Sequence, residues 1–339
     1  MRTMRTFQKN LAMRLYLVIA GFIFTSIGFG QVYTAQQPLV HTFSIVARDE
    51  KTGAMAVGVQ SHWFSVGTSV PWAEAGVGVI ATQSFVDKSY GVKGLQLLKK
   101  GLTARQALDE LYKADKGREV RQVAILDAKG NVASFTGKKC IDYASNITGK
   151  NFSVQSNMML TDRVCKSMAH AFETSVGKPL AERVLLALEA AQQAGGDIRG
   201  MQAAALVEVP GKASAQPWND RSVDLRVDDN PHPLQELRRL YNVHVAYQHM
   251  NNGDLAVEKN DMNAAMNEYG AAMKMFPANL EMQYWTAITL ANNKQISKAL
   301  PMLKSIFRQD ANWKELTKRL PKAGLLTVSQ QDLAAILDL

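Results

Sequence analysis

Hydrophobic and polar residues alternate along the stretch His41–Asp49, and this two-residue period predicts a β-strand. Thr42, Ser44 and Val46 fall on one face of that strand, and the residues between them fall on the other. A polar turn follows, and Ala54–Gln60 reads as the returning strand. The pattern therefore predicts a β-hairpin that opens a globular domain.

Similar patterns predict strands and helices as far as residue 227. The expected strands are 76–84, 121–126, 132–136, 152–156, 201–209 and 222–227, and the expected helices are 90–100, one beginning at Thr103, 161–173 and 179–194. Thr103 and Gln106 form a capping box. Pairs of helices separate the groups of strands, so the single βαβ alternation of a parallel sheet is absent. We predict an α+β fold of mainly antiparallel sheets with outer helical layers, up to four layers deep.

From Leu234 to Leu339 the strand patterns stop and the chain becomes helical, with a 34-residue period typical of tetratricopeptide units. The residue pairs one period apart are Gly253 and Ala287, Ala265 and Ala299, Tyr269 and Leu303, and Ala272 and Ile306. Asn260 falls in a turn between helices, where Asn tolerates a left-handed backbone. We expect an all-α tetratricopeptide-like domain over 234–339; the alternative is an unrelated helical bundle.

Residues 1–30 have the plan of a signal peptide, with basic residues followed by an apolar run from Leu15 to Phe29. That run is shorter than the about 20 residues that a membrane span needs. Gly28 and Gly30 suit cleavage after Gly30. We expect a cleaved leader, with an uncleaved anchor as the alternative, and export to the periplasm or the medium. A linker over 31–41 and a first domain over 42–233 should follow.

The 339-residue chain is 47% hydrophobic, which favours folded domains over disorder. Its net charge of +9 includes four positive charges in the leader, and the rest are scattered, so we expect no nucleic-acid partner. Cys140 and Cys165 could pair in an oxidising compartment or stay as free thiols. No HExxH, CxxC or glycine-rich phosphate motif occurs, and we expect neither a metal nor a cofactor.

The hydroxyl of Thr42 lies at the start of the first predicted strand. If the chain were cut just before Thr42, its free α-amine could serve as the base that activates the hydroxyl as a nucleophile. The alternative is that Thr42 is an ordinary β-branched strand residue.

Further stretches, in one order over about residues 42–240, resemble a known family. They are Thr42–Asp49, Val70–Ala73, Ala81–Ser84, Tyr90–Gly91, Arg121–Val123, Phe135–Gly137, Val154–Met158, Gly195–Gly200 and Val223–Asp229. Together they resemble domain-of-unknown-function family 1028, which is grouped with the N-terminal-nucleophile (Ntn) hydrolases. The resemblance implies an αββα sandwich and amide-bond hydrolysis, with Thr42 as the match for the nucleophile. Exposing the amine of Thr42 would require cleavage of the His41–Thr42 bond, by the chain itself or by another protease.

Candidate partners of Thr42 follow predicted strands. Gln83, Ser84 and Asn157 could donate hydrogen bonds to an oxyanion or a substrate, and the alternative is hydrogen bonding at the strand ends. Ser61 and His62 lie in a segment rich in hydroxyl and aromatic residues, and we take them as candidate binding residues. Asp197 and Arg199 are candidates for binding or, as we favour, for an internal ion pair.

The sequence thus leaves two functions open. The first is an exported Ntn-type amidohydrolase that acts on a small amide, a peptide or a cell-wall fragment. The second is a catalytically inactive binding or scaffold protein with the same fold. In either case the helical domain could recruit a protein partner or build a homo-oligomer.

Overall fold

The structure is a computed structural model that describes residues 39, 40 and 42–339. The predicted leader, most of the predicted linker and His41 lie outside the described residues. The chain divides into two compact units, which meet in sequence between Pro233 and Leu234. Within the described ranges, no helix combines the length and the hydropathy needed to cross a bilayer.

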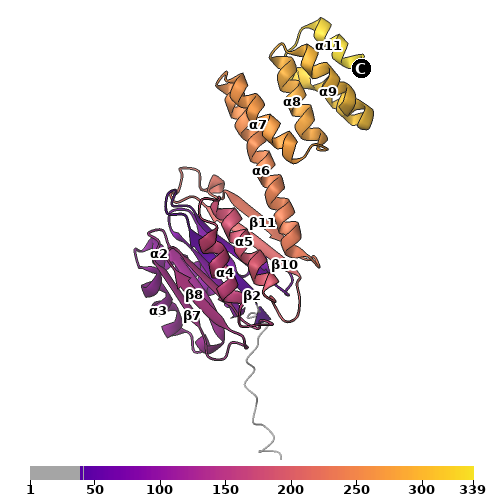
Figure 1. The fold of residues 1–339 in the computed structure, drawn as a ribbon. Helices are drawn as coiled ribbons and strands as arrows, with labels where there is room; N and C mark the ends of the chain where they lie inside the picture. The colour runs from indigo at the N-terminus through magenta and orange to yellow at the C-terminus, as the bar shows by residue number, and fades with distance from the viewer. Residues whose placement is uncertain (1–38, 41) are drawn as a thin grey trace, which may run out of the picture. The chain divides into compact units, whose positions relative to one another are not determined.

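The described strands of the first unit form two antiparallel sheets (Figure 1). In spatial order, the larger sheet consists of β11 (Val223–Val227), β10 (Ala203–Val209), β3 (Met55–Ser61), β2 (Thr42–Arg48), β9 (Phe152–Ser156) and β8 (Ser145–Gly149). The smaller sheet consists of β1 (Leu39–Val40), β5 (Gly78–Phe85), β6 (Arg121–Asp127) and β7 (Val132–Thr136), with β4 (Pro71–Glu74) also paired to β5. The predicted hairpin of β2 and β3 is present, with Thr42 opposite Ser61.

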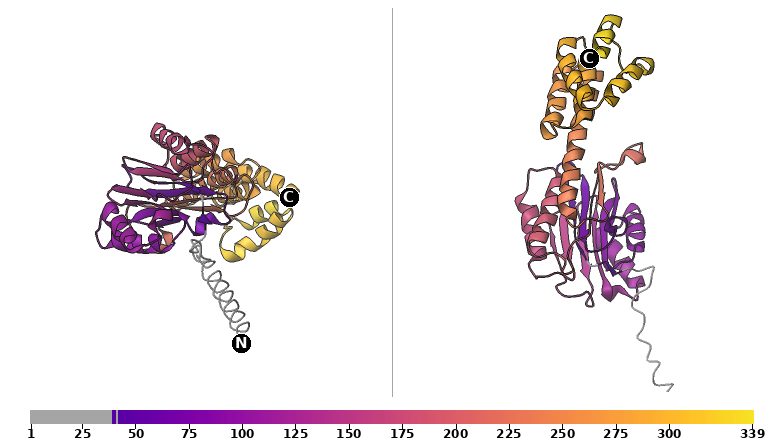
Figure 2. Two further views of the ribbon diagram at one scale, coloured as in Figure 1. Left: turned by 90° about the horizontal axis from the view of Figure 1, so that it is seen from below. Right: turned by 90° about the vertical axis from the view of Figure 1, so that its right-hand side faces the viewer.

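Two pairs of helices cover the outer faces of the sheets (Figure 2). Helices α2 (Ser89–Lys99) and α3 (Ala104–Ala114) pack on the smaller sheet, and α4 (Val164–Thr174) and α5 (Leu180–Gln193) pack on the larger one. The capping box of Thr103 and Gln106 begins α3 as predicted. The first unit is therefore a four-layer α/β/β/α arrangement, and the predicted mixed α+β class is confirmed.

An apolar core fills most of the space between the two sheets. Val46 and Val57 of the larger sheet meet Val79, Ala124 and Leu126 of the smaller one in this core. All five side chains are fully buried. Burial on this scale, at roughly 25 cal/mol per Å² of apolar area, is the main force that holds the sheets together.

Three strands were not predicted from the sequence. The first is β1, because Leu39 and Val40 pair with β5 although residues 31–41 were expected to be a linker. No strand was predicted over 71–74, but Pro71 begins β4, an edge strand in which the missing N–H of proline costs no ladder hydrogen bond. Strand β8 was not predicted because it is polar and only partly buried, so it lacks the apolar alternation that marks a strand.

The second unit is entirely helical. Its helices are α6 (Pro233–Glu258), α7 (Met262–Met275), α8 (Leu280–Asn292), α9 (Ile296–Gln309), α10 (Asn312–Ala323) and α11 (Gln330–Leu337). All eight residues of the predicted repeat pairs are buried. Gly253 permits a close helix crossing, because a Cβ atom there would lie 2.4 Å from Cε1 of Tyr269. Asn260 has the predicted left-handed backbone, with φ of 59°, and Lys294, one period later, has φ of 61°.

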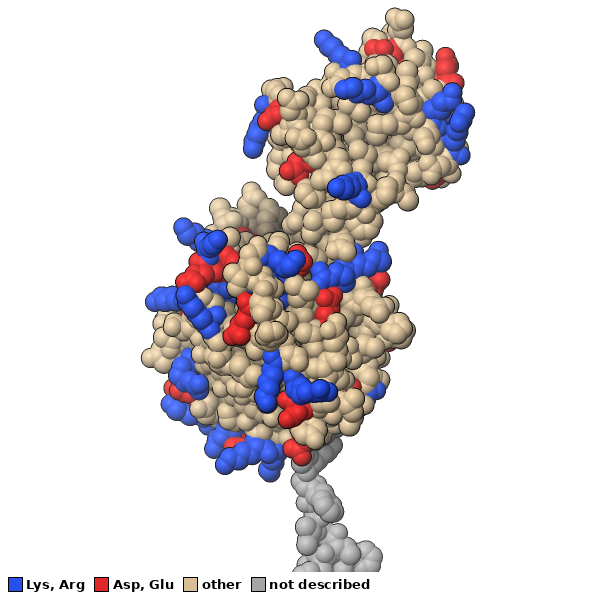
Figure 3. Space-filling view, in the orientation of Figure 1, with Lys and Arg blue, Asp and Glu red and all other residues tan. Residues whose placement is uncertain are grey.

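Charged side chains of both signs are interspersed on the face shown in Figure 3, over the first and the second unit alike. This view shows no continuous stripe of lysine and arginine. The mixing of signs agrees with the scattered basic residues seen in the sequence.

Candidate functional site

The interior between the two sheets changes from apolar to polar along β2. Val46 belongs to the apolar core, whereas Ser44 and Thr42, two and four residues earlier on the same face, carry hydroxyls. All three side chains are fully buried. The start of β2 therefore places polar side chains in an intersheet space that is otherwise filled by apolar ones.

On the neighbouring strands β5, β6 and β9, the buried side chains also include polar ones. Gln83 of β5 follows Ala81 by two positions, and Gln122 of β6 precedes Ala124 by two. Both alanines belong to the apolar core, and both glutamines are fully buried. Strand β9 adds Gln155, and Asn157 follows just after it; both are fully buried. We call Ser44, Gln83, Gln122, Gln155 and Asn157 the amide junction.

Gln83 connects the two sheets within the amide junction. Its Nε2 donates to Gln122 Oε1 at 2.7 Å and to the carbonyl oxygen of Thr42 at 3.2 Å. Its Oε1 accepts from Ser44 Oγ at 2.5 Å, and Ser44 Oγ accepts in turn from Gln155 Nε2 at 2.6 Å. A single side chain of the smaller sheet thus fixes both inward-facing residues at the start of β2.

Gln122 lies at the centre of the junction. Its Oε1 accepts from Asn157 Nδ2 at 2.8 Å as well as from Gln83. Its Nε2 donates to the carbonyl oxygen of Ser156 and to Thr136 Oγ1, both at 2.9 Å. A buried polar group left without a partner costs about 1–3 kcal/mol, so a fully bonded network of this kind specifies one arrangement of the strands.

Thr42, the predicted nucleophile, is the first residue of β2, and its side chain is fully buried. Its carbonyl oxygen accepts from the backbone N–H of Asn157 at 3.1 Å and from Gln83 Nε2, with Asn157 Nδ2 also close at 3.5 Å. Just before it, Leu39–Val40 pairs with Ser84 and Phe85 of the other sheet. The chain therefore passes from the smaller to the larger sheet between Val40 and Thr42.

Ser84 has an unusual conformation for a residue near the end of a strand. Its φ is 71°, in the left-handed region that residues other than glycine seldom adopt. Its hydroxyl is buried beside the Cys140 thiol and makes no hydrogen bond of good geometry within the described chain. Strained backbone and an unsatisfied buried polar group both call for an explanation, and each is common at functional sites.

A charged group secures the end of β5 next to Ser84. Arg121 donates from Nη1 to the carbonyl oxygen of Phe85 at 2.6 Å and from Nε to Asp115 Oδ2 at 2.8 Å. Burial opposes ionisation of Asp115, but hydrogen bonds from Arg121 and from the N–H of Gly117 outweigh it and lower the pKa of this carboxyl. Tyr90 donates to the same carboxylate, and burial together with that negative charge raises the pKa of its phenol.

The four predicted binding residues lie at and after the end of β3, where Ser61 pairs directly with Thr42 of β2. Ser61, the last residue of β3, is fully buried. The backbone N–H of the partly exposed His62 donates to Asp197 Oδ2 at 3.3 Å. Arg199 forms a two-pronged ion pair with the buried carboxylate of Asp197, at 3.0 Å and 2.6 Å. Asp197 is thus engaged by its own neighbours and anchors the segment after Ser61, which is the pairing that we favoured.

The two cysteines are not paired, so the disulfide alternative is wrong for this structure. Cys140 and Cys165 are both buried, and burial raises the pKa of each thiol. Because the thiolate is the reactive form, neither cysteine has the character of a nucleophile at neutral pH.

The acidic residues near the end of the first unit serve the fold. Asp224 pairs with Arg226 at 3.0 Å and with Arg221, and Asp228 accepts from Ser65 Oγ at 2.8 Å. Within residues 39–40 and 42–339, no three His, Cys, Asp or Glu side chains come close enough together to hold a metal ion.

Ser44, Gln122 and Gln155 were missed as site residues. A signal was present, since Ser44 shares its strand face with Thr42, and Gln122 shares its strand face with the apolar Ala124. What the sequence did not contain was the pairing of β2 with β9 and of β5 with β6, which brings the three side chains together.

Comparison with known proteins bears on the first unit. The model of one protein family, described as "Family of unknown function (DUF1028)", matches residues 42–237. The crystal structure of protein SPO2555 from Silicibacter pomeroyi, of that family, is 31% identical, with a TM-score of 0.54 over 59% of this chain and 84% of its own. Anbu, an ancestral β-subunit from Yersinia bercovieri, is 10% identical, with a TM-score of 0.29 over 59% of this chain and 93% of its own. No curated protein matches. The chain belongs to the DUF1028 family of unknown function.

Proposed function

We propose that the first unit is an amide hydrolase of the Ntn type, in which Thr42 attacks the carbonyl of the substrate after the chain has been cut before it. The position of Thr42 carries this proposal. It begins a central strand directly after the chain passes between the sheets, and Gln83 and Asn157 fix its backbone. The four-layer arrangement supports the grouping with Ntn hydrolases that the sequence resemblance implies.

The chemistry uses few groups. The free α-amine of Thr42 takes the proton from its own hydroxyl as Oγ bonds to the substrate carbonyl carbon. The amine then passes that proton to the leaving amine as the amide bond breaks, and water hydrolyses the resulting ester of Thr42. The described amide donors of Gln83 and Asn157 already engage Thr42 and Gln122, so we assign them as positioning residues.

Ser84 is the donor that we assign to the oxyanion. Its buried hydroxyl has no good partner in the described chain, and its strained backbone is held by the Arg121 contact to Phe85. A preorganised donor of this kind acts on charge that develops only in the transition state. For an exported protein we propose a small amide, a peptide or a cell-wall fragment as substrate.

The mass of the mature protein tests the proposal. We expect Thr42 as the first residue, and a β-lactone that acylates activated hydroxyls should attach once, at Thr42. T42A should abolish labelling and T42S should keep it, whereas T148A, a change at an exposed threonine of the same sheet, should leave it unchanged. A mature chain that starts at Gln31, together with no labelling of Thr42, would reject the proposal.

A second candidate function is a binding or scaffold protein without catalysis. The complete burial of the Thr42 side chain in the uncut chain favours it, because a substrate cannot reach a buried hydroxyl. In that case the amide junction is purely structural, and partner recognition falls to the helical unit. The same mass measurement separates the two functions.

A further inference from the structure

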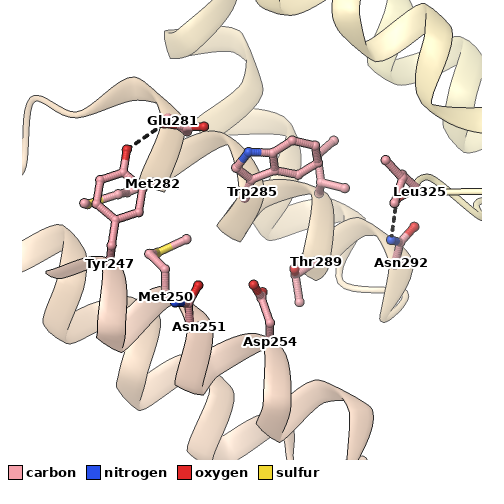
Figure 4. Close-up of a pocket in the computed structure, with 11 residues that line it drawn as sticks. Tyr247, Met250, Asn251, Asp254, Glu281, Met282, Trp285, Thr289, Asn292 and Leu325 are labelled. Carbon is pink, nitrogen blue, oxygen red and sulfur yellow. Dashed lines mark hydrogen bonds between the residues drawn. The ribbon is translucent and has the colours of Figure 1, made fainter. Parts of the chain in front are cut away.

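The helical unit contains a cavity of about 410 Å³ that neither the proposed hydrolase nor the repeat pattern uses (Figure 4). Its walls come from the second half of α6, from α8 and from the loop after α10. This volume lies within the range of small-molecule sites, about 300–1,000 Å³. The cavity lies wholly within residues 234–339, so it belongs to one unit.

Helical spacing directs a set of side chains into the cavity. Tyr247 and Asp254 lie seven residues apart on α6, and Glu281 and Trp285 lie four apart on α8, so each pair shares one face of its helix. In Figure 4, Asp254 points from α6 toward the indole of Trp285. Leu325, half-exposed at 51%, adds an apolar edge.

Each of the two carboxylates of the cavity is a hydrogen-bond acceptor for a tyrosine. Tyr247 donates to Glu281 Oε2 at 2.6 Å, and Tyr269 donates to Asp254 Oδ1 at 2.6 Å. The bond to Glu281 raises the pKa of Tyr247, and burial together with the bond to Asp254 raises that of Tyr269, so both phenols remain neutral donors. Neutral donors orient a carboxylate without cancelling its charge. Among the described residues, neither acid makes an ion pair, although the whole chain is basic.

An open cavity with two unpaired carboxylates and an aromatic face matches one ligand chemistry. A cation on an apolar stem would place its charge at a carboxylate, Asp254 or Glu281, and its methylenes on Trp285, whose ring also attracts a cation. An anion would meet two negative charges, and a neutral apolar group would leave both carboxylates unused.

We propose that this cavity binds a primary ammonium group carried on a chain of four or five methylenes. The lysine side chain of a peptide and a free diamine both offer this group. The site is independent of the chemistry at Thr42, so it stands whether or not the first unit is a hydrolase.

Calorimetric titration of the full chain tests the site with three probes: acetyl-Gly-Lys-Gly-amide, the same peptide with norleucine in place of lysine, and 1,5-diaminopentane. We expect the lysine peptide to bind saturably and the norleucine peptide, which has the apolar stem without the charge, not to bind. Binding of the diamine as well would identify the free amine as sufficient, and its failure to bind would assign the site to peptides.

Two variants keep the shape of the cavity and remove its charge. In E281Q and D254N the side-chain amide oxygen can still accept from the tyrosine, so the fold should persist and affinity should fall about fivefold for each, the upper value for an exposed ion pair. E258Q, a change at an exposed acid outside the cavity on α6, is the matched control and should bind like the wild type. Equal affinity for the lysine and norleucine peptides, unchanged affinity in both cavity variants, or no binding of either amine at millimolar concentration would overturn the proposal.

Discussion

The amide junction and the cavity of the helical unit are both polar, yet they are built in opposite ways. In the junction, uncharged amides from both sheets are fully buried and bond to one another. In the cavity, two carboxylates accept one bond each from a tyrosine and otherwise face open space. A satisfied network determines how the chain folds, whereas unused charge at an open surface is available to a ligand.

The comparison also clarifies the role of Thr42. The junction holds the backbone of Thr42 through its carbonyl oxygen, which accepts from Gln83 Nε2 and from the N–H of Asn157. Gln83 and Asn157 are therefore expected to matter first for stability and only through Thr42 for chemistry. Asp254 and Glu281 should show the reverse, with small effects on folding and larger effects on binding.

The largest expected effect is the loss of Gln122. Q122A removes the acceptor of Gln83 Nε2 and Asn157 Nδ2, and the donor to Ser156 and Thr136. Stranded buried groups and the space left behind should lower the free energy of unfolding of the first unit by about 3 kcal/mol. Denaturant unfolding gives the free energy, and hydrogen exchange of peptides from each unit assigns the loss to the sheets.

Q96A provides the control for this prediction, because Gln96 is an exposed glutamine on α2. It should change the free energy of unfolding by less than about 0.5 kcal/mol. A loss below about 1 kcal/mol in Q122A would mean that the junction contributes little to the fold, and the contrast with the cavity would fail.

The sequence predicted more of the scaffold than of the site. Alternation identified β2 and its inward face, and the capping box located the start of α3, because these features depend on neighbours along the chain. Gln122 and Gln155 come close to the start of β2 only because strands pair within each sheet and the two sheets stack. No local sequence pattern contains these long-range contacts. The cavity could not be predicted from the sequence either, because Asp254 and Glu281 lie on different helices and only helix packing brings them to one cavity.

An intermediate effect is expected at alkaline pH from Tyr269. Burial and the bond to Asp254 place the folded pKa of this phenol above its unfolded value of about 10, so its contribution to stability is complete below pH 10. As pH rises further the unfolded chain releases the proton first, and stability falls. Y269F should cost about 1–2 kcal/mol at pH 7 and should show a shallower loss above pH 10 than the wild type. Parallel pH profiles of the two proteins would show that the phenol does not cause the alkaline loss.

The smallest expected effect on folding belongs to the charges of the cavity. D254N and E281Q replace a carboxylate oxygen by an amide oxygen that can still accept from Tyr269 or Tyr247, and both positions are exposed. Each should therefore change the free energy of unfolding by less than about 0.5 kcal/mol. Thermal unfolding without ligand, at low and at high salt, measures this directly, with E258Q as the matched exposed position. A loss of more than about 1.5 kcal/mol in either variant would mean that the carboxylates are structural, as the amides are. The amide junction and the cavity would then differ in chemistry, but both would act by stabilising the fold.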